Sequence, residues 1–254
     1  MFNHELAIWF VVGVKRNVVW LSAGVSSFIA GYLVKDIVTD WIYIDIADQH
    51  PDSMRFIKDC EKAIGCEVQI LKSKKYDCVE DVIRKHKLIN SPYGAPCTGM
   101  LKKQVRKIWE REHLGDELTY IWGFDLDEKH RAESIVQNFP EFNHMFPLID
   151  KQLSKQDCHG ILQRMGIKRP VMYDLGYQNN NCLGCVKGGM WYWNQIRKDF
   201  PEVFKARAEL EREVGHSCIN GVFLDELDPT AGRKSEEITG DCGVICYLEY
   251  QNLK

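Results

Sequence analysis

Cysteine is the residue type with the most chemistry to offer in this chain. The 254-residue sequence holds ten cysteines. A chain of this length buries about 70–75% of its unfolded surface, so it does not need disulfides in order to fold. Cys182 and Cys185 have the C-x-x-C spacing that brings two thiolates to one metal ion or to two corners of one cluster. The sequence therefore indicates sulfur or metal chemistry.

The overall composition restricts the class of protein. Lys and Arg number 33 against 36 Asp and Glu, which gives a formal charge of −3, and 45% of the residues are hydrophobic. This balance is typical of a globular protein without a polybasic surface. The longest apolar stretch, residues 6–14, is about half of the ~20 residues that a membrane helix requires, and Glu5 disfavours a signal peptide. We expect a cytoplasmic protein with no membrane partner and with reduced thiols.

Apolar runs alternate with helix-length segments along the first half of the chain. Strands are predicted over 18–21, 41–46, 67–71 and 119–124, with helices over 26–34, 52–64, 79–88 and 99–113. This alternation predicts a doubly wound α/β fold, Rossmann-like, with a mostly parallel sheet. Further helices are predicted over 155–165, 191–199 and 201–214. We therefore expect an α/β nucleotide-binding domain in 1–150 and a helical, irregular C-terminal extension in 151–254, packed on the same domain.

The first strand runs into the loop Ser22-Ala23-Gly24-Val25-Ser26-Ser27, where a helix begins. Free backbone N–H groups at such a helix start can hold an anion, and the small residues let phosphate oxygens approach the backbone. The hydroxyls of Ser22, Ser26 and Ser27 can donate to the same oxygens. The alternative is a plain strand–turn–helix junction capped by Ser26.

This loop resembles the SGGxDS pyrophosphate loop of the adenine-nucleotide hydrolases, which include ATP pyrophosphatases and phosphoadenylyl- and adenylyl-sulfate (PAPS/APS) reductases. Ser22 and Ser27 match, whereas Ala23 replaces a glycine and Ser26 replaces the aspartate. The resemblance implies that an adenine nucleotide binds here, either an adenylyl sulfate or ATP with Mg²⁺. The residues implied in nucleotide binding are Ser22, Ala23, Gly24, Ser26, Ser27 and, near the adenosine, Asp45.

Two cysteine segments resemble the iron–sulfur-containing adenylyl-sulfate reductases. The stretch Gly176 to Cys185 resembles their Gly-Tyr…Gly-Cys-x-x-Cys segment, and Pro96 to Lys102 resembles their Cys-Cys-x-x-x-Lys motif, with Thr98 in place of the second cysteine. The resemblance implies that Cys97, Cys182 and Cys185 ligate a [4Fe-4S] cluster whose fourth iron is open or otherwise ligated. It also implies that Lys102 lies over the cluster and the substrate. Alternatively, Cys97 fills a core, and Lys102, Lys103 and Arg106 form a solvated basic helix face.

The tail around Cys242 resembles the Glu-Cys-Gly-Ile/Leu-His end of the sulfonucleotide reductases, with Ile245 at the histidine position. The resemblance implies that Cys242 is the nucleophile that attacks sulfur. The alternatives are that Cys242 is a fourth cluster ligand or an ordinary strand residue.

The segment Gly123 to Arg131 resembles the reductases' Gly-x-Arg…Glu-Ser…Arg, with Asp125 in place of the first arginine. Arg131 is then expected to pair with phosphate or sulfate oxygens. A surface helix with solvated charges is the alternative. Lys168 and Arg169 are further candidates for closing over an anion.

The remaining cysteines, Cys60, Cys66, Cys78, Cys158 and Cys218, have no motif context and are interpreted as small buried hydrophobes. The aromatic run 191–193 is expected to form core or to shield the cluster, with base stacking as the alternative.

Three functions are compatible with these residues. The first is an iron–sulfur oxidoreductase resembling PAPS/APS reductases, with a thioredoxin-like electron donor. The second is an ATP-dependent [4Fe-4S] sulfurtransferase that thiolates tRNA or DNA. The third is a non-enzymatic nucleotide-binding protein stabilised by zinc on Cys182, Cys185, Cys242 and Cys246. The Cys-Gly tail favours the first.

Overall fold

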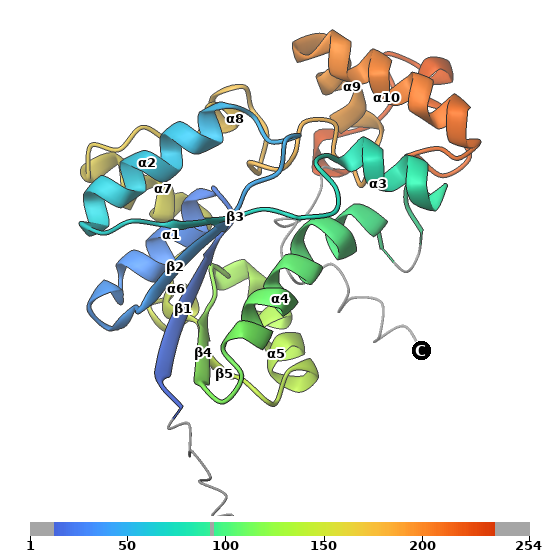
Figure 1. Cartoon of the computed structure of the whole chain (residues 1–254). Coiled ribbons are helices and arrows are strands. Elements are labelled where there is room, and N and C mark those ends of the chain that lie inside the picture. The colour runs from blue at the N-terminus through green and yellow to red at the C-terminus, as the bar shows by residue number, and fades with distance from the viewer. Residues whose placement is uncertain (1–12, 92–93, 237–254) are drawn as a thin grey trace, which may run out of the picture.

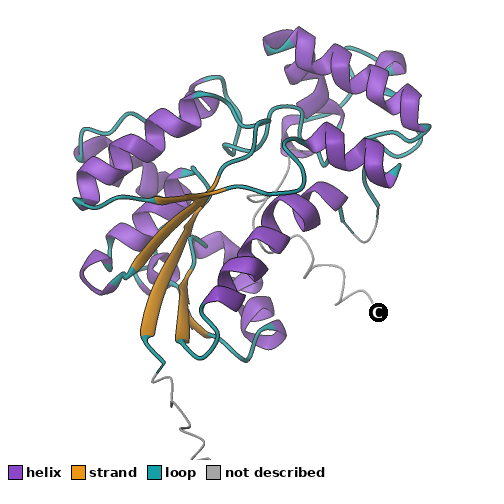
Figure 2. Cartoon of the chain, in the orientation of Figure 1, coloured by secondary structure: helices purple, strands orange, loops and turns teal. Residues whose placement is uncertain are grey.

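The described part of the chain forms one parallel sheet with helices on both of its faces (Figures 1 and 2). The computed structural model describes residues 13–91 and 94–236. Within them five strands lie in the order β3-β2-β1-β4-β5, and every neighbouring pair is parallel. The strands are β1 (Lys15–Leu21), β2 (Asp40–Ile44), β3 (Gln69–Leu71), β4 (Glu117–Ile121) and β5 (Asn143–Met145). The predicted doubly wound α/β fold is confirmed.

Helices follow most of the strands. They are α1 (Val25–Tyr32), α2 (Asp52–Ile64), α3 (Val79–His86), α4 (Gln104–Glu112), α5 (Lys129–Asn138), α6 (Pro147–Asp150), α7 (Lys155–Arg164), α8 (Val171–Asp174), α9 (Met190–Asp199) and α10 (Pro201–Val214). A π-helical segment, Thr98–Lys103, leads directly into α4. None of the described helices is both long and apolar enough to cross a membrane.

The alternation of side chains along β1 builds two cores. Val19 belongs to the core that the sheet forms with α1, α2 and α7, whereas Val18 belongs to the core that it forms with α4 and α5. Both residues are fully buried. Successive strand residues point to opposite faces, so a sheet covered on both faces requires apolar residues at consecutive positions. The run Val18-Val19 meets this requirement.

A third core lies beyond the sheet. It joins α3, α9 and α10 to the end of β2 and to the segment that holds Cys182 and Cys185. Figure 1 shows α3, α9 and α10 together at one end of the molecule. Some residues after 150, those of α9 and α10, thus belong to this helical group. Others, those of α7, pack on α1 and so lie with the sheet. The division at residue 150 remains a prediction.

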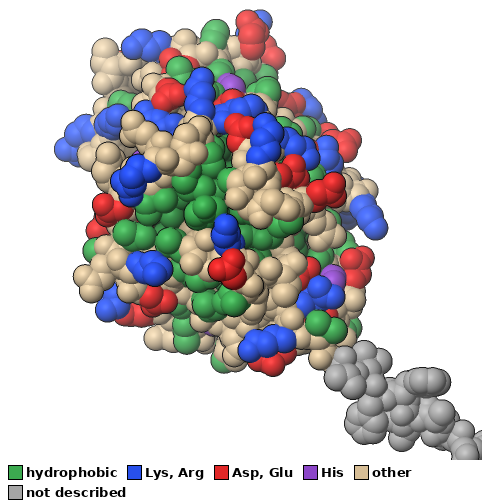
Figure 3. Space-filling model, turned by 90° about the vertical axis from the view of Figure 1, so that its left-hand side faces the viewer, with side chains coloured by type: hydrophobic (Ala, Val, Ile, Leu, Met, Phe, Trp, Pro, Cys, Tyr) green, Lys and Arg blue, Asp and Glu red, His purple; other side chains and the backbone are tan. Residues whose placement is uncertain are grey.

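The face that carries α1, α2 and α7 has apolar side chains gathered in its middle, with Lys and Arg side chains above them (Figure 3). Leu33, at the end of α1, and Ile161 and Met165, on and just after α7, are partly buried against the core below.

The sequence-based bounds differ from the structure in identifiable places. The predicted helix over 99–113 is a π-helix followed by α4, and the strand predicted over 119–124 begins and ends earlier, as β4. The short edge strand β5 was not predicted, because Asn143-His144-Met145 has neither an apolar run nor an alternating pattern. Its backbone bonds to β4 define it.

The strand order places two loops at the topological switch point of the sheet. The chain leaves β1 towards β2 on one side and later returns to form β4 on the other side of β1. The loops after β1 and β4 therefore adjoin at the carboxyl edge, where ligands of doubly wound sheets bind. They are in close contact, because a Cβ atom built on Gly123 would lie 2.5 Å from the Cα atom of Ser27.

We predict that Gly123→Ala destabilises the fold by about 1–3 kcal/mol, the usual cost of overpacking, because the added methyl group meets backbone that cannot turn aside. The matched control is Gly160→Ala inside α7, where the nearest atom would be 3.5 Å away at the end of Arg164. Alanine at that position is expected to stabilise by about 0.5–1 kcal/mol. Urea unfolding of both variants measures the difference, and equal effects would contradict the close packing of the two loops.

Candidate functional site

The loop between β1 and α1 is tied by its own serines. The Ser22 amide donates to Ser27 Oγ at 3.1 Å, Ser27 Oγ donates to the Gly24 carbonyl at 3.0 Å, and the two hydroxyls lie 3.0 Å apart. Ala23 has a left-handed backbone with φ of 58°. This conformation costs an L-residue about 1–2 kcal/mol, which explains why the resembling loops have glycine there. The loop holds the start of α1 towards the carboxyl edge of the sheet.

Two side chains from the C-terminal half close over this loop. The Asn180 amide nitrogen donates to the Ala23 carbonyl at 2.8 Å and to Ser53 Oγ at 3.0 Å, and the Val25 amide donates to the Tyr173 hydroxyl at 3.4 Å. Asn180 is 3% exposed, and its carbonyl oxygen has no hydrogen-bond partner within the described residues. The loop is thus covered by residues about 150 positions away in the sequence.

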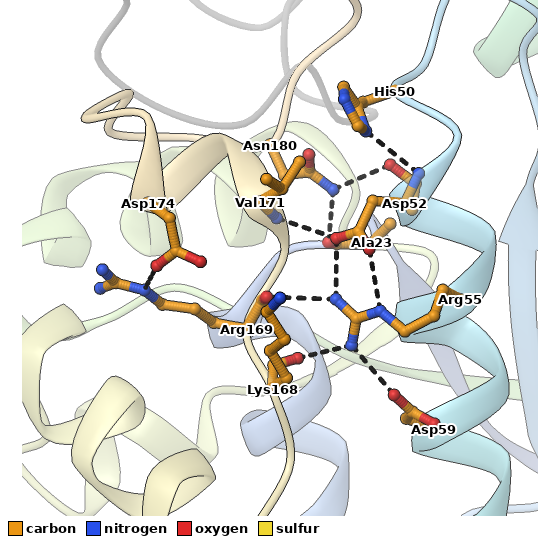
Figure 4. A network of polar contacts seen from close by, with 11 residues as sticks. Ala23, His50, Asp52, Arg55, Asp59, Lys168, Arg169, Val171, Asp174 and Asn180 are labelled. Carbon is orange, nitrogen blue, oxygen red and sulfur yellow. Dashed lines mark hydrogen bonds and ion pairs between the residues drawn. The ribbon is translucent and has the colours of Figure 1, made fainter.

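A polar network fastens this cover to α2 (Figure 4). The Arg55 guanidinium donates to the Lys168 carbonyl at 2.7 Å and to the Arg169 carbonyl at 3.1 Å. Asp52 accepts from Arg55 and from the Val171 amide at 2.8 Å. Hydrogen bonds from Arg55 lower the pKa of Asp52, so that carboxylate stays charged at neutral pH. The network sets where Tyr173 and Asn180 lie.

A lysine and a buried carboxylate flank the loop on the side of α7. Lys155 Nζ donates to the Asn179 side chain at 2.5 Å, and Asn179 precedes the residue that binds Ala23. Asp125, 4% exposed, caps the turn after β4 by accepting from the Asp127 amide. Burial raises the pKa of Asp125, and the positive charge of Lys155 offsets part of that effect.

The C-x-x-C segment is held by one tyrosine. The Cys185 amide donates to the Tyr192 hydroxyl at 2.9 Å, and that hydroxyl donates to the Cys182 carbonyl at 3.1 Å. Gly184 between the cysteines is left-handed, with φ of 64°, and a Cβ atom there would lie 2.8 Å from Val203. Both cysteines are buried in the third core together with Tyr192 and Trp193. The expected core role of these two aromatic residues is confirmed.

Asp48 joins the cysteine segment to two other elements, α3 and α10. Its backbone carbonyl accepts from the Leu183 amide at 2.8 Å, and its carboxylate accepts from the Val79 amide at 2.7 Å. The other carboxylate oxygen lies 3.4 Å from the buried Arg207 guanidinium of α10. Arg207 Nε and Nη1 have no hydrogen-bond partner within the described residues. Asp48 thereby fixes Leu183, inside the C-x-x-C segment, relative to α3 and α10.

The three predicted ligand cysteines belong to one apolar cluster. Cys97 is partly buried and packs against the core that contains Cys182 and Cys185. The thiols are therefore suited in kind to a soft metal or to an iron–sulfur cluster. Across residues 13–91 and 94–236, however, no three His, Cys, Asp or Glu side chains are grouped so that they could hold a metal ion. The ligand set remains a prediction.

The cysteines without motif context divide in two. Cys60, Cys158 and Cys218 are buried, as interpreted, whereas Cys66 is exposed and Cys78 is half-buried.

Cations gather beside Cys97 and the end of the C-x-x-C segment. Burial, together with the nearby charges of Arg106, Lys107 and Lys187, lowers the pKa of Lys103 to about 8. Arg106 does not share a solvated face with Lys102 and Lys103 as one alternative supposed. It is 3% exposed, lies 3.4 Å from Glu110 and stacks over the Phe139 ring. The π-helix turns the lysines and the arginine to different surroundings.

Other candidate residues have partners of their own. Arg131 is buried, paired with Glu128 and placed 4.9 Å over the Phe124 ring, so the solvated-helix alternative does not describe it. Its Nε has no hydrogen-bond partner among the described residues. Asp45 pairs with Lys72 at 2.7 Å, and Arg169 pairs with Asp174 at 2.6 Å. Cys242 lies outside the described residues, as do Cys246 and Ile245.

The sequence analysis assigns no contact to three residues of this site, which are Lys155, Asn179 and Asn180. The signal for two of them was present, since a run of three asparagines immediately before a C-x-x-C is an unusual polar segment to find buried. Nothing in the sequence indicated which loop the asparagines would meet.

We predict that Lys103 makes stability pH-dependent in a defined window. The pKa of Lys103 is about 8 in the folded chain, below the 10.5 of an unperturbed lysine. The folded chain therefore releases this proton at a lower pH than the unfolded chain, and the free energy of unfolding rises with pH between these two values. Denaturant unfolding of the wild type and of Lys103→Met from pH 7 to pH 10 should show this rise as a difference between the two. Lys151→Met, an exposed lysine, serves as control. Parallel profiles of wild type and Lys103→Met would contradict the burial of the ammonium group.

Comparison with known proteins gives likenesses to solved structures. No protein-family model matches the chain, and no curated protein matches it. Among solved structures, the chain is similar to the phosphoadenylyl-sulfate (PAPS) reductase from Candida auris in its phosphate complex, with a TM-score of 0.50 and 15% identity. The match covers 69% of this chain and 85% of that one. At this identity the likeness concerns the fold: this chain has a PAPS reductase-like fold.

Proposed function

We propose that this protein is an adenine-nucleotide-dependent enzyme of sulfur chemistry, similar to the sulfonucleotide reductases. One observation carries the proposal: Asn180 binds the Ala23 carbonyl of the loop, and Cys182 follows two residues later. This contact supports a single site in which the loop is proposed to bind an anion and the thiol segment to supply the sulfur chemistry. The likeness to a PAPS reductase in a phosphate complex supports the nucleotide part.

The loop supplies the phosphate-binding part of the site. The proposed donors for the phosphate oxygens are the backbone N–H groups that begin α1 and the hydroxyls of Ser22, Ser26 and Ser27, at the positive end of the helix dipole. Ser27 would exchange its present bond to the Gly24 carbonyl, and Val25 its bond to Tyr173, for bonds to the ligand. Asp45, at the carboxyl end of β2, is the residue proposed to lie near the adenosine. Its present pairing with Lys72, whose side chain is 68% exposed, is weak enough to be exchanged for a ligand.

In the proposed reaction the thiolate of Cys242 attacks the sulfur atom of an adenylyl sulfate. A sulfur–sulfur bond forms and the bond between sulfur and the phosphate oxygen breaks, so the nucleotide leaves as a phosphate monoester and the enzyme carries a thiosulfonate. A dithiol donor of the thioredoxin type then attacks the cysteine sulfur, displaces sulfite and is oxidised to a disulfide. Lys102 and Arg131 are proposed to stabilise the charge on the sulfate and the leaving phosphate.

A [4Fe-4S] cluster on Cys97, Cys182 and Cys185 is part of the proposal. The shared apolar cluster and the hold of Tyr192 on the C-x-x-C segment support it. When bound, such a cluster places a dense charge centre, tuned by hydrogen bonds and burial, beside the substrate. The residues of the chain contribute the thiolates, the apolar surroundings and the cations of Lys103 and Lys187.

A second function is favoured by Asp125. The resembling reductases have an arginine at this position, which suits a sulfate, whereas here a buried carboxylate adjoins the loop. A carboxylate suits Mg²⁺ bound to the phosphates of ATP. The alternative is therefore an ATP-dependent sulfurtransferase that adenylates an oxygen of tRNA or DNA and replaces it with sulfur. Release of sulfite from adenylyl sulfates, measured beside ATP–pyrophosphate exchange, distinguishes the two functions.

We predict that protein purified without oxygen is brown, with broad absorbance near ~400 nm, because thiolate-to-iron charge transfer gives [4Fe-4S] proteins this colour. Cys182→Ser should lose the colour and the iron, whereas Cys66→Ser, at an exposed cysteine outside every motif, should retain both. Colourless wild-type protein with stoichiometric zinc would refute the cluster and favour the zinc-stabilised, non-enzymatic alternative.

We predict that Cys242→Ser abolishes sulfite release from an adenylyl sulfate while leaving the colour and the nucleotide affinity unchanged, because serine is far less nucleophilic than a thiolate. Sulfite is measured with a reduced dithiol donor present. Loss of the colour in this variant would show that Cys242 is a cluster ligand, and full activity would show that it is not the nucleophile.

A further inference from the structure

We propose, on the basis of the proposed nucleotide function, that Lys155 contacts the phosphate group bound at the loop and that Asn179 positions it. The loop needs a cation from elsewhere, because residues 22–27 contain no charged side chain. Phosphate sites commonly pair backbone N–H groups with at least one lysine or arginine. The question is which cation the fold brings to this place.

Helix α7 presents Lys155 on the side that faces the loop. The helix is capped by Ser154, begins with Lys155 and packs against α1. Cys158, three residues after Lys155, is buried in the core below α1, where burial raises the pKa of its thiol and the nearby Ser26 hydroxyl offsets part of that effect. Residues three apart share one face of a helix, so Lys155 and Cys158 lie on the same face of α7.

The contact with Asn179 brings the ammonium group close to the loop. Lys155 Nζ lies 2.5 Å from Asn179 Oδ1, and the next residue, Asn180, donates to the Ala23 carbonyl at 2.8 Å. Figure 4 shows the amide nitrogen of Asn180 turned towards Ala23. Asn179 is 6% exposed, so its side chain has little freedom to move. An ammonium group has three donors and Asn179 accepts one hydrogen bond from it, which leaves donors for phosphate oxygens.

Asp125 supplies a negative charge near Lys155. The Lys155 charge acts favourably on the buried Asp125 carboxylate, and Gly123, two residues earlier, touches Ser27 of the loop. The two opposite charges offset each other beside the loop. A phosphate that enters adds negative charge beside Asp125, and Lys155 then provides the compensating cation.

The test is calorimetric titration with ATP, adenosine and inorganic pyrophosphate. Lys155→Met should weaken ATP and pyrophosphate binding about tenfold or more, as expected for a lost charged hydrogen bond, and leave the affinity for uncharged adenosine unchanged. Lys155→Arg should retain most of the affinity for ATP, and Lys151→Met should bind like the wild type. Asn179→Ala keeps the Lys155 charge but removes the hydrogen bond that positions it. This variant should therefore lose an intermediate amount of affinity, and only for the charged ligands.

The outcomes separate this inference from the proposed function. Unchanged ATP and pyrophosphate affinity in Lys155→Met overturns the inference, as does an equal loss for adenosine, which would indicate a structural role. Wild-type protein that binds pyrophosphate but no adenine nucleotide refutes the proposed function and leaves the Lys155 contact measurable with pyrophosphate. Wild-type protein that binds neither overturns both.

Discussion

The amide of Asn180 holds the C-terminal half of the chain on the loop after β1, and the arrangement of the site depends on it. Its two hydrogen bonds, to Ala23 and to Ser53, are buried, so losing them would leave acceptors without partners at a cost of about 1–3 kcal/mol. The bond to Ala23 also supports the left-handed conformation of that residue. Because Cys182 follows closely, any ligand that moves the loop acts on the thiol segment through a very short path.

The buried pair of Asp48 and Arg207 fixes the position of the cysteine segment, as Asn180 fixes the position of the loop. Asp48 and Arg207 are both largely buried. The hydrogen bond from the Val79 amide, at the start of α3, offsets part of the free-energy cost of removing the Asp48 carboxylate from water. Burial still raises the pKa of Asp48, which shows that its partners do not compensate fully. Such a network is a weak source of stability but a strong source of specificity, since only one arrangement of β2, α3 and α10 satisfies it.

The charges around the loop distinguish this chain from the reductases that it resembles. The aspartate of the resembling loop is Ser26 here, and the arginine after the fourth strand is Asp125, which lies beside Lys155. Positive charge thus comes to this site from α7, while a second group of cations, around Lys103, lies beside the cysteines.

The sequence by itself determined what depends on local patterns. Buried strands such as the one that contains Val18 and Val19 appear as apolar runs, and the serine-rich turn predicts the start of a helix. The spacing of Cys182 and Cys185 brings them into one short turn. These features depend on neighbours a few residues away, so they are visible without a fold. The short strand β5 and the π-helix before α4 were not predicted, because backbone pairing and packing decide them rather than periodicity.

Only the tertiary structure decided which distant side chains meet. Val25 lies 148 residues from Tyr173, and Ala23 lies 157 residues from Asn180, so no local pattern connects them. The sequence predicts that Arg106 and Arg131 are solvated cations or anion-binding groups, yet both are buried against aromatic rings. The physical reason is that an arginine's surroundings depend on the direction in which its helix faces, and the packing of the sheet layers sets that direction.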